Sequence, residues 1–223
     1  MRKIVCVLVA LSMLVLVPLT GCGKDNTADI KAAVDGFMGA MQAGDISGMK
    51  EYCDPALFET GGTLADFNTL ENIDEELANS VGMDPSQLSD KTKETVNNYV
   101  NELLSSMIAS YEIGEITEPE EGKAEAKVDV TFGFDPDKMT NIDINSEAEA
   151  LAQDYMNENM AELQKIYMEG GQDALMNKVL DDLVGDLLDK YVEEVKKTGQ
   201  VDRASTLTLE NKDGKWLITG ETF

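Results

Sequence analysis

The chain has 223 residues and a strongly acidic composition, with 18 Lys and Arg against 43 Asp and Glu and a formal net charge of −25. This charge argues against a nucleic-acid partner, whose phosphates need cations, and against lying flat on anionic lipid. The chain also contains no histidine, which excludes Ser-His-Asp and Cys-His catalysis and histidine-bearing zinc sites. The absence of histidine leaves carboxylate acid/base catalysis and Ca²⁺ binding open. We expect no cofactor and no metal site.

The first residues have the features of an export signal. Arg2 and Lys3 are basic, and a mostly apolar run of fourteen residues follows from Ile4 to Val17. This run is shorter than the roughly 20 residues that a membrane-spanning helix needs. Leu19-Thr20-Gly21-Cys22 follows it and resembles a bacterial lipobox. An ordinary secretory signal and an uncleaved anchor are the alternatives.

The lipobox resemblance implies that the thiol of Cys22 receives a diacylglyceryl group and that the signal peptide is removed on its N-terminal side. Two acyl chains, such as palmitate, hold a protein stably at a membrane. We therefore expect a signal peptide over 1–21, the lipidated cysteine and a short tether over 22–26, and a single extracytoplasmic domain over 27–223. This domain would be lipid-anchored to the outer face of the cell membrane.

The other two cysteines offer little chemistry. Cys6 lies in the signal peptide, so Cys53 remains without a partner for an intramolecular disulfide. It lies on an apolar helix face, where a lone cysteine usually acts as a small buried hydrophobe. No histidine is present to activate it as a nucleophile.

Amphipathic helices are predicted for the first part of the domain. The apolar residues of the first predicted helix, which runs from Thr27 to about Gln42, recur at helical spacing: Ile30, Ala33, Val34, Phe37, Met38 and Met41. A short second helix follows Asp45, and Pro55 ends it. Ala-Gly-Asp at 43–45 and Tyr-Cys-Asp-Pro at 52–55 resemble the opening of NTF2-like domains.

Two further helices are expected before the sheet. The first covers residues 64–79. Asp84-Pro85-Ser86-Gln87 then has the pattern of a capping box with proline at the first helical position. The helix after Ser89 carries one apolar stripe, formed by Val96, Val100, Leu103, Leu104, Met107, Ile108 and Tyr111.

Strands are predicted in the middle and at the end of the chain. Residues 111–118 alternate weakly between apolar and polar side chains, and residues 123–134 alternate cleanly. This pattern is typical of a strand with one buried and one solvent-exposed face. A C-terminal hairpin over 204–222 turns at Asp213-Gly214. Its Lys-Asp-Gly-Lys-Trp-Leu-Ile stretch resembles the closing hairpin of NTF2-like domains. We expect an α+β fold with an antiparallel sheet of about four strands covered by amphipathic helices, NTF2-like with helical insertions.

The segment after the central strand is acidic. Its oxygen-bearing side chains lie at mostly alternate positions, as calcium ligands do: Asp135, Asp137, Asn141, Asp143, Asn145 and Glu147. The EF-hand pattern fails, because Thr140 replaces the required glycine and Ser146 the bidentate glutamate. We expect an acidic loop with a helix cap, and calcium binding is the alternative.

Two long helices, divided at Gly170-Gly171, follow this loop. The second has an acidic face with near i, i+4 spacing, formed by Asp182, Asp186, Asp189 and Glu193. A solvated face is expected there, with cation binding as the alternative. The apolar stripes of both helices and their methionines favour core packing, and a hairpin that docks a partner is the alternative.

Several functions are compatible with this pattern. We expect a non-catalytic binding or interaction module of the cell envelope, held by its lipid anchor, with an envelope protein or a small molecule as partner. The NTF2-like resemblance implies a curved sheet whose concave side either is a filled core or lines a pocket through Tyr111, Val128, Val130, Phe132 and Trp216. The alternatives are an enzyme with a carboxylate beside a tyrosine in such a pocket and a purely structural surface lipoprotein.

Overall fold

The protein folds as an α+β molecule with one four-stranded antiparallel sheet, as the sequence predicted. The computed structural model describes residues 25–59, 61–62, 64–139 and 141–222, so the predicted signal peptide and Cys22 lie outside the described residues. In chain order the elements are α1 Thr27–Ala43, α2 Ile46–Tyr52, η1 Pro55–Phe58, α3 Ala65–Glu71, α4 Ile73–Val81, η2 Pro85–Gln87, α5 Asp90–Met107, β1 Ile108–Glu120, β2 Lys123–Phe132, α6 Pro136–Met139, α7 Asn145–Lys197, β3 Val201–Lys212 and β4 Lys215–Thr222.

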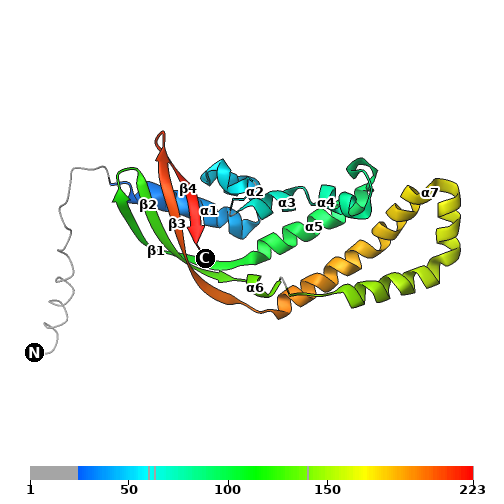
Figure 1. Ribbon diagram of the computed structural model, residues 1–223. Helices are drawn as coiled ribbons and strands as arrows, with labels where there is room; N and C mark the ends of the chain where they lie inside the picture. Colours follow the sequence, from blue (N-terminus) through cyan, green and yellow to red (C-terminus); the bar gives the residue numbers. More distant parts are fainter. Residues whose placement is uncertain (1–24, 60, 63, 140, 223) are drawn as a thin grey trace, which may run out of the picture.

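The sheet is a meander in which each strand pairs with the next, in the order β1-β2-β3-β4. The register places Ala126 opposite Leu207 and Leu209 opposite Ile218, so apolar side chains of neighbouring strands share one face. On β2 the alternation is as predicted: Ala124, Ala126, Val128, Val130 and Phe132 are buried and the residues between them are exposed or partly buried. Helix α1 covers this apolar face (Figure 1).

Helix α1 confirms the prediction from its periodicity, because all six predicted apolar positions are buried. The helix ends at Gly44, which adopts a left-handed conformation with φ of 69°. The turn continues into Asp45, whose carboxylate accepts a hydrogen bond from the backbone N–H of Gly48 at 2.9 Å and so caps α2. This tight connection folds α2 back against α1.

Two predictions in the middle of the chain need correction. The helix expected over 64–79 is two helices, because Asn72 leaves helical geometry and bonds its side chain to the carbonyl of Asn68 at 2.8 Å. The predicted capping box at Asp84 is present and caps the single turn η2, and the long helix starts after Ser89, as predicted. Ile108 and Tyr111, assigned to the helical stripe, lie on β1, which follows α5 with no intervening turn.

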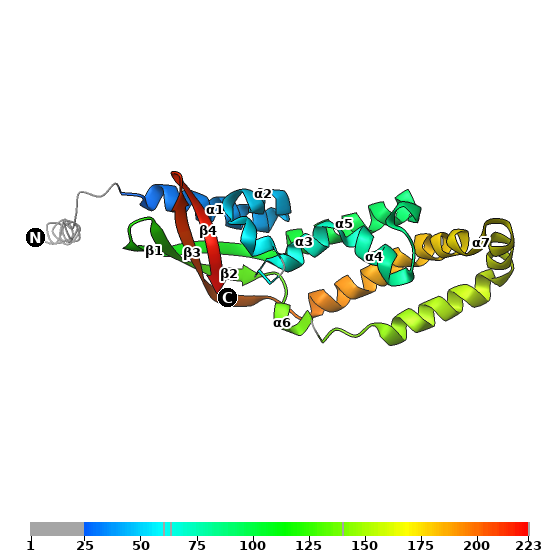
Figure 2. The same ribbon diagram turned by 45° about the horizontal axis from the view of Figure 1, so that its top comes forward.

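The molecule has a sheet end and a helical end. The sheet, α1 and α2 lie together, while α4, α5 and α7 extend away from the sheet as an arm (Figures 1 and 2). Helix α5 enters β1 directly and α7 is followed closely by β3, so the arm is continuous with the two strands that flank β2. Within the described part of the chain, no helix has the length and apolarity needed to cross a bilayer.

Candidate functional site

The residues suggested as a pocket lining under the sheet lie mostly in the core. Val128, Val130, Phe132 and Trp216 are buried in one cluster with the apolar face of α1 and with β3 and β4. Tyr111 packs against the edge of the same cluster and is partly exposed. Side chains therefore fill the space between sheet and helices, which is the filled-core alternative.

Tyr111 does meet a carboxylate, the arrangement that an enzyme would need. Its hydroxyl donates a hydrogen bond to Asp35 Oδ1 at 2.9 Å, and burial together with this bond raises the pKa of Tyr111. Asp35 is exposed on the outer side of α1, however. The pair thus lies at the surface of the molecule.

The acidic loop before α7 is held by cationic side chains. Arg203 from β3 contacts Asp135 at 3.3 Å and Asp137 at 2.6 Å, and Lys138 contacts Asp135 at 3.1 Å. The ammonium of Lys138 is the main cause of the lowered pKa of Asp135. Among the residues that the structure describes, no group of three or more Cys, Asp or Glu side chains is placed to hold a metal ion.

The most distinctive surface lies on the arm, where α7 turns back on itself. Gly171 has φ of 72° and ψ of −163°, a conformation that favours glycine, and it divides α7 into a first half, 145–170, and a second half, 172–197. The sequence predicted this division at Gly170-Gly171. We refer to the two halves together as the helical hairpin.

The second half of the hairpin is fixed to α5. The carboxylate of Asp181 accepts hydrogen bonds from Thr92 Oγ1 at 2.7 Å and from the hydroxyl of Ser89, the residue that caps α5. Tyr99 and Tyr191 stack edge to face, with ring centroids 6.4 Å apart. These contacts make the second half and α5 a stable base for the hairpin.

The first half of the hairpin contacts the second half across a seam. Tyr155 donates a hydrogen bond to Asp182 at 2.7 Å, and Lys178 contacts both Asp182 at 2.7 Å and Glu162 at 3.6 Å. Leu163 is buried at this seam. Away from it, the first half carries apolar side chains that no other part of the described chain covers.

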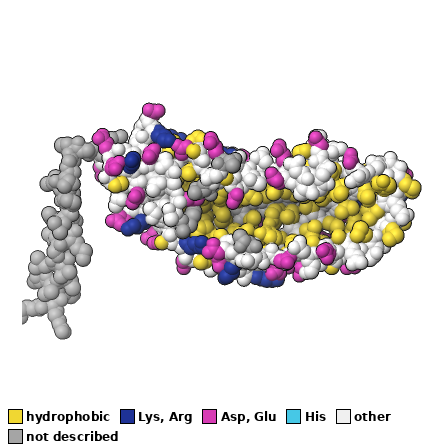
Figure 3. Space-filling model, in the orientation of Figure 1, with side chains coloured by type: hydrophobic (Ala, Val, Ile, Leu, Met, Phe, Trp, Pro, Cys, Tyr) yellow, Lys and Arg dark blue, Asp and Glu magenta, His cyan; other side chains and the backbone are white. Residues whose placement is uncertain are grey.

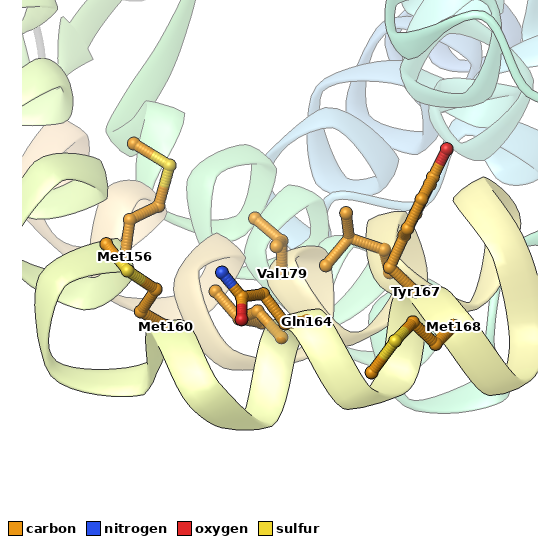
Figure 4. A pocket seen from close by; sticks show the side chains of 8 residues that line it. Met156, Met160, Gln164, Tyr167, Met168 and Val179 are labelled. Carbon is orange, nitrogen blue, oxygen red and sulfur yellow. The ribbon is translucent and has the colours of Figure 1, made fainter.

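These uncovered side chains line a groove along the hairpin with a volume of about 430 Å³. Met156, Met160, Tyr167 and Met168 are 52%, 54%, 56% and 78% exposed, respectively. Leu175 and Val179 of the second half complete the groove together with Leu163 and Gln164. Figure 4 shows Met156, Met160, Gln164 and Met168 succeeding one another along the first half, with Val179 behind them. We refer to this surface as the arm groove.

The arm groove lies in acidic surroundings. Residues 145–197 carry thirteen acidic side chains and five lysines. Figure 3 shows a continuous apolar strip along the arm with acidic side chains on both of its long edges. The surface thus combines an uncovered apolar floor with a negatively charged border.

Core packing was the expected role of these methionines, and for Met156, Met160 and Met168 that expectation is wrong. Their spacing of four or eight residues marks one apolar face of a helix. The same spacing occurs in a helix that is covered by a core. The signal that could have distinguished the two is the Gly-Gly kink, which leaves the first half with a partner on one side only.

Comparison with known proteins finds no matching family model and no matching curated protein. Among solved structures, the crystal structure of a putative lipoprotein (ycdA) from Bacillus subtilis subsp. subtilis str. 168 is similar, with a TM-score of 0.42 and 15% sequence identity. The similarity covers 90% of this chain and 56% of that chain, so this chain spans little more than half the length of the protein it matches. A likeness this distant does not transfer a fold family or a function.

Proposed function

We propose that the protein is a lipid-anchored extracytoplasmic binding protein that holds an apolar segment of a partner in the arm groove, without chemical turnover. The observation that carries this proposal is the exposure of four large apolar side chains on one side of the hairpin, each by more than half of its surface. Contiguous apolar surface of this kind on a soluble domain marks an interaction site.

The chemistry of the groove suits a partner with variable side chains. Three of its lining residues are methionines, whose unbranched and polarizable side chains adapt to different apolar shapes. Burying the exposed halves of four such side chains contributes roughly 1 kcal/mol each. After the entropic cost of association, this supports reversible binding of moderate affinity.

The placement of the protein follows from the lipobox resemblance. Acylation of Cys22 would hold the folded domain close to the membrane, because only residues 23–26 separate this cysteine from α1. Four extended residues reach at most about 14 Å. The sheet end would then lie near the bilayer and the arm would extend from it, where the groove can meet segments of envelope proteins.

A binding measurement with a defined ligand tests the proposal. The ligand is an amphipathic peptide of about 18 residues, built from Leu and Gln and labelled with an uncharged fluorophore, which spans the groove as a helix of about 27 Å. Anisotropy is measured with the full chain in nanodiscs of zwitterionic lipid, and empty nanodiscs provide the background. We expect saturable binding that the triple variant Met156→Gln, Met160→Gln, Met168→Gln weakens at least roughly tenfold.

A matched variant on the outer side of the same helix half provides the control. Glu158→Gln with Lys165→Gln changes two exposed residues outside the groove lining and leaves the net charge unaltered. Its affinity should equal that of the parent chain. Equal weakening by both variants, or no saturable binding to the parent chain, contradicts the assignment of the arm groove as a binding site.

A further inference from the structure

The shape and composition of the arm groove determine which backbone conformation an occupant can adopt. The groove is lined by side chains of two helix segments, whose backbone N–H and C=O groups are bonded within their own helices. It therefore offers no free sheet edge to an extended peptide, which would bury unpaired backbone groups. An α-helix satisfies its own backbone and presents apolar side chains at i, i+3, i+4 and i+7.

The dimensions of the groove agree with a helical occupant. Met156 and Met168, which stand near its two ends, are twelve residues apart on one helix. At 1.5 Å per residue this separation is about 18 Å, or a little more than three helical turns of an occupant. Three turns provide the four or five apolar anchors that helix-in-groove recognition uses.

The acidic side chains at the sheet-side end of the groove favour an occupant with positive charge. Helical repeat places Glu149 on the face of Met156, seven residues earlier, and Asp186 on the face of Val179, seven residues later. Asp189 and Glu193 follow along the second half. These four exposed carboxylates form what we name the acidic mouth. Lys190 lies among them. The pKa of Glu147 is lowered by the hydrogen bond from Ser146 and, to a smaller extent, by the charge of Lys190.

The same charge argues against a second copy of this chain as the occupant. The hairpin carries a net charge of −8 over residues 145–197, and the whole chain −25. Two hairpins packed groove to groove would bring their acidic borders together, and like charges facing each other oppose association. A partner with basic residues beside its apolar stripe meets no such penalty.

We infer that the occupant of the arm groove is a cationic amphipathic helix of a partner polypeptide, with an apolar stripe on the groove floor and Lys or Arg side chains against the acidic mouth. This inference rests on the proposed function, since it assigns the partner class of the same groove. It adds a charge requirement that the apolar surface alone does not impose.

Three peptides of identical apolar sequence test the charge requirement. They carry Lys, Gln or Glu at the polar positions and are compared by anisotropy with the full chain in zwitterionic nanodiscs, against empty nanodiscs. We expect the Lys peptide to bind roughly tenfold more tightly than the Gln peptide and the Glu peptide to bind most weakly. Salt at about 0.5 M should remove most of the difference between the Lys and Gln peptides.

Charge-neutralising variants locate the effect. Glu149→Gln, Asp186→Asn and Glu193→Gln remove three carboxylates of the acidic mouth, while the control Glu112→Gln, Glu121→Gln and Glu125→Gln removes three exposed carboxylates near the sheet. The first triple variant should abolish the preference for Lys over Gln, and the second should keep it. Abolition by both variants overturns the inference, because net charge alone then explains the preference.

The outcomes separate this inference from the proposed function. Equal binding of all three peptides, still weakened by the methionine variants, overturns the charge requirement and leaves the groove a binding site. Failure of all three peptides to bind overturns both. A dimer of the full chain in light scattering that the methionine variants dissociate would also overturn the inference, because a second copy would then occupy the groove.

Discussion

Tyr155 and Asp182 join the two halves of α7 directly, since the phenol of Tyr155 donates a hydrogen bond to Asp182 Oδ2 at 2.7 Å. Burial, and then this bond, raise the pKa of Tyr155 to about 12, so the phenol remains a donor at every physiological pH. Lys178 and then Tyr155 lower the pKa of Asp182. The contact lies at the seam of the helical hairpin and maintains the separation of the two halves that the arm groove requires.

Removal of this hydroxyl should loosen the hairpin. Tyr155→Phe leaves Asp182 with the ammonium groups of Lys178 and Lys91 and no hydroxyl donor from the first half. We expect a decrease of about 1 kcal/mol in the free energy of unfolding, measured by urea titration. Tyr167→Phe is the matched control, because no hydrogen bond of the Tyr167 hydroxyl occurs among the described residues and that side chain is exposed. Equal stability of the Tyr155 variant and the parent chain would show that the seam does not depend on this bond.

The attachment of the hairpin to α5 should depend on Asp181. Its carboxylate accepts from both Ser89 and Thr92, and Thr92 is fully buried, so Asp181→Ala leaves a buried hydroxyl without its acceptor. We expect a loss of roughly 2 kcal/mol in the free energy of unfolding. Asp186→Ala, on the exposed side of the same helix half, should change stability by less than about 0.5 kcal/mol. Similar losses from the two variants would contradict this role.

Stability should fall as the pH rises from about 5 to about 8, because of Glu221. Burial raises the pKa of this carboxyl from 4.5 to about 7, and its Oε2 is buried without a partner among the described residues. Below pH 4.5 the carboxyl is protonated in both the folded and the unfolded state. As the pH rises toward 7, only the unfolded state releases the proton, so the folded state loses up to roughly 3 kcal/mol relative to it.

The variant Glu221→Gln should remove most of this decrease, while Glu125→Gln, which changes an exposed strand residue, should keep it. Urea titrations of the full chain at about pH 5 and about pH 8 measure the difference. A parent chain whose stability is constant over this interval, or a Gln variant with the same decrease, would exclude Glu221 as the source.

Thiol counting tests the roles of the three cysteines together. Cys53 is 2% exposed, and burial, followed by the charges of Glu221 and Asp54, raises its pKa to about 12. We expect no reaction of the native protein with a thiol reagent at about pH 8 and one thiol per chain in urea. Two reactive thiols in urea would show that Cys22 is unacylated or that Cys6 is still present.

Much of the sheet end could be predicted from sequence because its signals are local. The alternation on β2, the six apolar positions of α1 and the Asp213-Gly214 turn each specify a backbone conformation through neighbouring residues. The break at Asn72 could not be predicted, because a single side-chain bond to Asn68 decides it. The NTF2-like resemblance stays a prediction, since no family model matches the chain.

The site could be predicted only in part, and the reason is physical. Helical periodicity identified the apolar face that carries Met156 and Met160, but periodicity does not reveal what covers a face. The exposure of these residues follows from the Gly171 kink together with the attachment of the second half to α5. The kink is visible in the sequence as Gly170-Gly171, but the attachment to α5 joins residues about 90 positions apart and could not be predicted from the sequence of the first half.

Methyl NMR of the full chain in nanodiscs, with labelled methionine methyl groups, tests the binding role of the arm groove most directly. On titration with the Lys-bearing peptide, we predict saturable chemical-shift changes at Met156, Met160 and Met168, and unchanged shifts at the core residues Met38 and Met49. Unchanged shifts at the three groove methionines while the peptide binds elsewhere, or no binding at all, would contradict the assignment of the arm groove as the functional site.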